Sequence, residues 1–63
     1  MINYALKIRE YRERKLFTQE DLAKVLCVSV TSVTRWENGK FKPTFSIKRK
    51  LKMLFEEAGM KVE

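Results

Sequence analysis

The 63-residue sequence contains no histidine and a single cysteine, Cys27. An internal disulfide is therefore excluded, and so is a zinc site built from cysteine and histidine. No apolar run approaches the roughly 18 residues of a membrane-spanning helix, and residues 1–6 lack the hydrophobic region of a signal peptide. We expect a soluble, cytoplasmic protein that makes no contact with a membrane.

The groups that carry most enzyme chemistry are also missing from the sequence. There is no glycine-rich phosphate loop and no cluster of metal-ligating residues, and most carboxylates have the spacing of a solvated helix surface. We therefore expect no enzymatic activity, no metal and no cofactor.

Length and apolar spacing predict one all-α domain over residues 1–63. A chain this short has room for one small core. Its apolar residues follow helical spacing throughout, and no segment alternates with period two. Capping residues divide the chain into four helices, the first over about 4–15. These residues are Asn3, Thr18, Ser29 and either Thr44 or Ser46 at the helix starts, and Gly39 and Gly59 at the ends of the last two.

The predicted core consists of the apolar residues on one face of each helix. Trp36 could instead serve as a base-stacking platform, but its helical spacing from Val33 favours a core position. Phe41, between the third and fourth helices, could be buried or exposed. The full set of core positions is Tyr4, Ile8, Tyr11, Phe17, Leu22, Ala23, Leu26, Val28, Val33, Trp36, Phe45, Ile47, Leu51, Leu54, Phe55 and Ala58.

The positive charge of the chain is concentrated in one stretch. Residues 35–52 contain seven basic residues and one acid, Glu37, and so account for the whole net charge of +6. A polyanion is the expected partner of such a stretch. A lysine-rich face that only keeps the protein in solution is the alternative.

Residues 18–40, TQEDLAKVLCVSVTSVTRWENGK, read as two short amphipathic helices joined by a tight turn. Their sequence resembles the Cro and phage-repressor type of helix-turn-helix, in particular the xenobiotic-response-element-like bacterial regulators. The resemblance is carried by TQEDLAKVL, VS and RWENGK, and it is strong from Ile8 to Pro43. It implies a shortened, four-helix λ-repressor-like domain whose helix-turn-helix unit spans residues 18–38 and whose third helix, about 30–38, enters the major groove.

The resemblance also assigns roles to individual residues. Arg12 and Glu37 match a pair that forms a structural salt bridge between the first and third helices. The residues expected to face base edges are Val30, Thr31, Thr34 and Arg35, and those expected to hold DNA phosphates are Thr18, Gln19, Asn38, Lys40 and Lys42. Among them Arg35 is the best candidate for reading a guanine, with a phosphate contact as its alternative.

The chain departs from the family pattern at several positions. Cys27 and Leu16 stand where the family usually has glycine. A left-handed backbone at Cys27 would cost about 1–2 kcal/mol, unless the turn differs slightly, and we expect its thiol to pack near Val28. Lys48 and Lys52 replace residues that are commonly apolar. With Arg49 and Lys50, they either extend the phosphate contacts or simply solvate the fourth helix.

These patterns predict a sequence-specific DNA-binding transcriptional regulator, a repressor, with double-stranded DNA as its partner. Specificity from so small a module suggests a homodimer on a (pseudo)palindromic operator. Its contact would come from Leu54, Phe55, Met60 and Val62. The alternative is an antitoxin-like or adaptor module that uses the same fold to bind an acidic protein.

Overall fold

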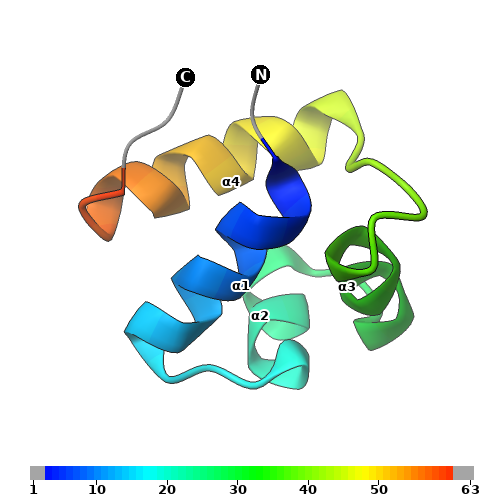
Figure 1. The fold of residues 1–63 in the computed structure, drawn as a ribbon, viewed down its shortest axis with the longest axis horizontal. Helices are drawn as coiled ribbons and strands as arrows, with labels where there is room; N and C mark the ends of the chain where they lie inside the picture. The colour runs from blue at the N-terminus through cyan, green and yellow to red at the C-terminus, as the bar shows by residue number, and fades with distance from the viewer. Residues whose placement is uncertain (1–2, 61–63) are drawn as a thin grey trace.

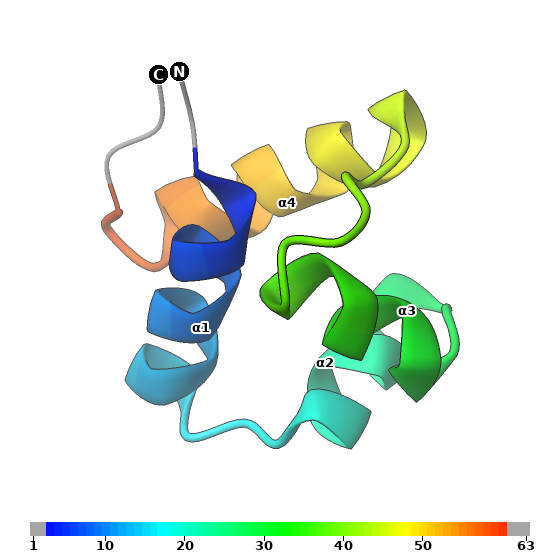
Figure 2. The ribbon, with the colours of Figure 1, turned by 45° about the vertical axis from the view of Figure 1, so that its right-hand side comes forward.

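The computed structural model describes residues 3–60, which form four helices and no strand. They are α1 (Tyr4–Lys15), α2 (Gln19–Leu26), α3 (Val30–Glu37) and α4 (Phe45–Glu57). Helix α4 lies along one side of the molecule and α2 and α3 lie on the other, with α1 reaching from one side to the other (Figures 1 and 2). The predicted all-α fold class is confirmed.

Side-chain caps begin the first three helices at the predicted residues. Asn3 accepts a hydrogen bond from the Leu6 amide, and Ser29 accepts one from the Ser32 amide. Thr18 and Asp21 form a reciprocal capping box, in which each side chain bonds the other residue's backbone N–H. Helix α4 begins after Thr44, whose side chain makes no capping hydrogen bond.

Helices α1 and α2 end in left-handed residues that are not glycine. Leu16 has φ 57° and Cys27 has φ 58°. After each of them the next amide bonds a carbonyl five residues back, Phe17 to Arg12 at 2.8 Å and Val28 to Ala23 at 2.9 Å. The backbone at Cys27, in the turn between α2 and α3, is therefore left-handed. The expected packing of the Cys27 thiol is wrong, because this C-cap side chain points into solvent.

The core lies where the four helices meet. Helical spacing predicted most of it correctly, and Tyr4, Phe17, Val28, Ile47, Leu54 and Ala58 are half-buried against it. The buried apolar residues are Ile8, Tyr11, Leu22, Ala23, Leu26, Val33, Trp36, Leu51, Phe55 and Met60.

Two predictions about apolar residues of the C-terminal region are wrong. Phe45 is 75% exposed, because it lies about 120° around the helix from Leu51 at roughly 100° per residue. Phe55 and Met60, predicted to contact a second copy, are 0% and 5% exposed inside the core of the single chain. Of the other two residues predicted for this contact, Leu54 is half-buried against the core and Val62 lies beyond the described residues.

None of the four described helices has the length and apolarity that a membrane crossing requires.

Candidate nucleic-acid interface

Helix α3 is fixed from one side only. Val33 and Trp36 are buried in the core, and they face α1 and α2, which are the helices that α3 packs against. On the opposite side Val30, Thr31 and Arg35 are exposed to solvent. Residues three and four apart share a face of a helix, so this short helix presents one packed face and one open face.

The packed side of α3 includes a buried carboxylate, Glu37, whose side chain is 3% exposed. Arg12 of α1 donates from Nε to Oε2 at 2.6 Å and from Nη2 to Oε1 at 2.8 Å, so the ion pair is bidentate. Gln19 of α2 donates from Nε2 to Oε1 at 3.2 Å. Arg9 of α1 donates from Nη2 to the Glu37 carbonyl at 3.1 Å. The carboxylate thus joins three helices at one point.

The charge at this point is well compensated. Burial by itself would raise the pKa of Glu37. Hydrogen bonds from Arg12 and Gln19, together with the positive charges of Arg12 and Arg9, more than offset burial and hold that pKa below its usual value. The hydrogen bond to Glu37 raises the pKa of Arg12. Both groups are therefore charged at neutral pH, and Glu37 is not available as a general acid or base.

Gln19 and Thr34 are two of the predicted DNA contacts, and the structure joins them. The Thr34 hydroxyl lies 2.8 Å from Gln19 Oε1 and 3.1 Å from the Val30 carbonyl, and it can donate to only one of them. Its oxygen can still accept a hydrogen bond from another group. Gln19 uses one N–H for Glu37 and keeps the second for another partner. Thr18 is exposed at the same helix end, where its side chain completes the capping box.

Arg35 stacks on Phe41 on the open side of α3. The guanidinium carbon lies 5.3 Å from the centre of the Phe41 ring, and the ring itself is 57% exposed. Arg35 is itself exposed, and the face of an aromatic ring attracts a cation placed over it. Sequence reasoning left Phe41 open between burial and exposure, and it gave no sign of this stack.

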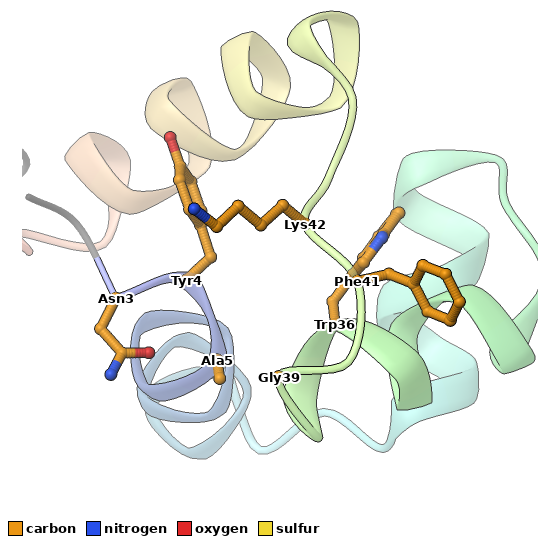
Figure 3. Close-up of a pocket in the computed structure, with 7 residues that line it drawn as sticks. All are labelled: Asn3, Tyr4, Ala5, Trp36, Gly39, Phe41 and Lys42. Carbon is orange, nitrogen blue, oxygen red and sulfur yellow. The ribbon is translucent and has the colours of Figure 1, made fainter.

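The remaining predicted phosphate contacts follow α3 directly. Asn38 caps the C-terminus of α3, and Asn38, Lys40 and Lys42 are all exposed. Figure 3 shows the Lys42 side chain extending from the connector toward Tyr4. It crosses an open hollow of about 420 Å³ between the connector and the first turn of α1. In this conformation Lys42 points along the surface of the domain.

Two further cations have partners inside the domain. The Lys48 ammonium lies 5.4 Å from the centre of the Tyr4 ring, which ties α4 to α1. Arg14 donates from Nη1 to the Ala58 carbonyl at 3.1 Å. Lys48 therefore has a structural role in this chain, whereas Arg49, Lys50 and Lys52 are exposed.

The described residues hold no group of three potential metal ligands. The sequence reasoning did miss Arg9, which bonds the Glu37 backbone and lies 3.7 Å from its carboxylate. Its spacing of one turn from Arg12, on the face toward α3, was a signal that could have found it.

Comparison with known proteins identifies relatives of this arrangement. The profile of the helix-turn-helix family matches residues 8–51. A protein of Methanocaldococcus jannaschii, named as an uncharacterized HTH-type transcriptional regulator, is 39% identical over 57 residues. Those residues cover 90% of this chain and 82% of the relative. No solved structure matches the chain significantly.

Proposed function

The chain belongs to the helix-turn-helix family, and we propose on that premise that it is a sequence-specific transcription regulator, acting as a repressor. Membership of this family supports a DNA-binding regulator. We propose in addition that α3 lies in the major groove of double-stranded DNA and that residues 1–63 act as one domain inside the cell.

One observation carries this proposal: the open face of α3 is exposed to solvent, and its Arg35 lies over the exposed Phe41 ring. Val30 is 40% exposed, and Thr31 and Arg35 are exposed beside it. The other face of the same helix is buried and hydrogen-bonded. Because its buried face is packed and hydrogen-bonded, α3 can place the side chains of its exposed face at fixed positions in a groove.

Arg35 is the proposed source of discrimination between bases. A guanidinium can bond guanine O6 and N7 together, which is worth about 1–3 kcal/mol against a wrong base. Stacking on Phe41 supports this role, because it orients the guanidinium before DNA arrives. Val30 and the Thr31 methyl group are suited to thymine methyls, and the Thr34 oxygen is suited to a donor such as an adenine or cytosine amino group.

Phosphate contacts are proposed on both sides of this reading face. Thr18 and the free N–H of Gln19 lie at the N-terminus of α2, where the backbone amides of a helix favour an anion. Asn38, Lys40 and Lys42 lie beyond the C-terminus of α3. Contacts of this kind fix the position of the protein on the duplex and carry no sequence information directly.

We further propose that two copies bind a (pseudo)palindromic operator. A single module buries only about 600–1,000 Å² on DNA, which is little for a site that must be found in a genome. Two half-sites about one helical turn apart would be read by two copies related by a two-fold axis.

Selection from a pool of random duplexes, followed by sequencing, tests the proposed function. The expected result is an enriched motif with a guanine that is strongly preferred at one position of each half-site. The salt dependence gives a second measure, because each Lys or Arg on a phosphate adds about 0.9 to the log–log slope. Lys40→Ala should reduce the slope by about that amount.

The same selection separates a DNA-binding regulator from an antitoxin-like or adaptor module. A protein-binding module would leave the duplex pool without an enriched motif while still binding an acidic protein. That result would overturn the proposed function.

A further inference from the structure

A second surface of the domain is open and apolar. A groove of about 170 Å³ runs between the last turn of α2 and the second half of α4. Two of its residues are unusually exposed for apolar side chains, Val25 at 45% and Met53 at 66%. None of the proposed DNA contacts lines it. The lining residues are Val25, Leu26, Lys50, Met53, Leu54 and Glu57.

The two charges of the groove are arranged symmetrically along α4. Lys50 and Glu57 are seven residues apart, about two helical turns, and so lie on the same side of the helix. The midpoint between them falls between Met53 and Leu54. The order along this side is therefore cation, two apolar residues, then anion.

We infer that this groove is the surface on which a second copy of the chain docks, with the two α4 helices antiparallel. A two-fold axis at the midpoint would place Lys50 of one copy against Glu57 of the other, twice, with Met53 and Leu54 between the pairs. An interface between identical copies requires such self-complementarity. This inference rests on the proposed function, in which two copies share one operator.

The described structure favours a second copy over another occupant. Within residues 3–60, neither Lys50 nor Glu57 forms an ion pair. A partner of one charge sign would leave one of these two residues facing its own sign, whereas a second copy satisfies both. Methionine is enriched at protein interfaces, and its flexible side chain can fill a small groove. Because the patch is small, the dimer should be weak without DNA.

The location of the groove agrees with DNA binding by both copies. Its walls come from α2 and α4, and α3 contributes no residue to it. Docking there leaves Val30, Thr31 and Arg35 uncovered. The exposed charge Lys50 thereby has a role other than the phosphate contact considered from the sequence.

Sedimentation velocity of the full chain without DNA, over a concentration series, tests the inference. Wild type should show a reversible monomer–dimer equilibrium. Met53→Glu should weaken it at least tenfold, and so should Lys50→Glu and Glu57→Lys, which each create two like-charge contacts. An equimolar mixture of Lys50→Glu and Glu57→Lys should recover dimers, because the mixed pair restores both ion pairs. The double exchange Lys50→Glu/Glu57→Lys should recover them as well.

Leu6→Glu is the matched control, since Leu6 is 60% exposed on α1 away from the groove, and it should leave the equilibrium unchanged. Circular dichroism establishes that each variant is folded. A monomeric wild type at every concentration would overturn the inference, and so would a dimer that Met53→Glu does not weaken or a mixture that stays monomeric. The proposed function would survive those results if duplex selection still enriched a half-site. Loss of all enrichment with intact dimers would overturn the proposed function and leave the docking surface standing.

Discussion

The two faces of α3 differ in almost every physical respect. The inner face buries Val33 and Trp36 and pairs Glu37 with residues of α1 and α2. The outer face exposes Val30 and Arg35, and Arg35 lies over the exposed Phe41 ring. An eight-residue helix is too short to be stable by itself in water. The contacts of the inner face therefore stabilise the helix, and the side chains of the outer face are free to bind a partner. Changes to the inner face should alter stability, and changes to the outer face should alter binding.

The largest effect should come from removing the partner of the buried carboxylate. Arg12→Leu leaves Glu37 without its two-pronged ion pair in a site that is 3% exposed. Breaking such a pair typically costs about 3–5 kcal/mol, which is much of the stability of a domain this small. Urea unfolding followed by circular dichroism should show a midpoint that falls steeply or an unfolded chain.

Arg14→Leu is the matched control for Arg12→Leu. Arg14 lies half a turn further along the same helix, and its ion pair with Glu10 is largely exposed, with side-chain exposures of 48% and 42%. Its hydrogen bond to the Ala58 carbonyl is exposed as well. Exposed pairs contribute about 0–1 kcal/mol. Equal losses in the two variants would show that the Glu37 network does not hold α3 in place.

Acid should weaken the same inner face more gently. The pKa of Glu37 is lowered in the folded state, so the unfolded chain takes up the proton first as the pH falls. The contribution of the carboxylate is complete above about pH 5 and decreases below the unfolded value, near 4.3, until the folded pKa is passed. Asp21 acts in the same direction, because hydrogen bonds from Thr18 lower its pKa.

The measurement is the free energy of unfolding between pH 6 and pH 3 for wild type and Glu37→Gln. Glu37→Gln should be less stable at pH 6 and should depend less on pH. The acid effect should be smaller than that of Arg12→Leu, since a protonated carboxyl is neutral and keeps some hydrogen bonds. Parallel curves for the two proteins would contradict the assignment.

The helices and most of the core could be predicted because their causes are local. Asn3, Thr18 and Ser29 satisfy amides three residues ahead, and a period of 3.6 residues places the buried side chains. Phe45 was misplaced because an aromatic residue at a helix start was assumed to pack, although its angular position lies outside the buried stripe.

The contacts of the candidate site were harder to predict, because they depend on how distant segments meet. Arg9 is 28 residues from Glu37 in the sequence, and a sequence pattern cannot say which of two arginines on α1 takes the carboxylate and which the carbonyl. The stack of Arg35 on Phe41 depends on the path of the connector after Gly39, which no periodicity fixes. Met60 was misplaced for a similar reason, since only the packed fold shows that the chain after α4 turns back into the core.

On the outer face, Arg35→Ala should give the largest change. It removes the proposed guanine contact, so discrimination at one operator position should fall by about 1–3 kcal/mol while other positions keep their preferences. Unfolding should be nearly unchanged, because the side chain is exposed. Competition binding with operators changed one base pair at a time measures this. Uniform weakening across all sequences would instead indicate a phosphate contact.

Cys27→Gly should raise the stability of the domain without changing its operator preference. The residue is left-handed at φ 58° and its side chain is exposed, so glycine relieves about 1 kcal/mol of strain and loses little packing. For a domain of this size that is a rise of about 4–8 °C in the melting temperature. Cys27→Ala is the matched control, because it removes the thiol and keeps the Cβ, and it should give no such rise. Equal melting temperatures for the two variants would place the effect in the thiol. A changed operator preference would show that the turn influences the outer face.

The smallest predicted effect concerns Phe41. It tests whether the Phe41 ring orients the Arg35 side chain on the outer face of α3. Phe41→Leu removes the cation–π contact with Arg35, which is worth about 0.5–1 kcal/mol at an exposed site. Operator affinity should fall about two- to fivefold, and preference for the guanine should fall with it. Phe41→Tyr keeps the ring and should bind like wild type.

The decisive measurement for Phe41 is the double variant with Arg35→Ala. If Phe41 acts only by orienting the guanidinium, Phe41→Leu should have no further effect once Arg35 is gone, and the two changes should be strongly non-additive. Additive losses would mean that the Phe41 ring contacts DNA independently. In that case the outer face would consist of separate contacts, whereas coupling would show that its main base-reading residue is held in place before DNA binds, as Glu37 is on the inner face.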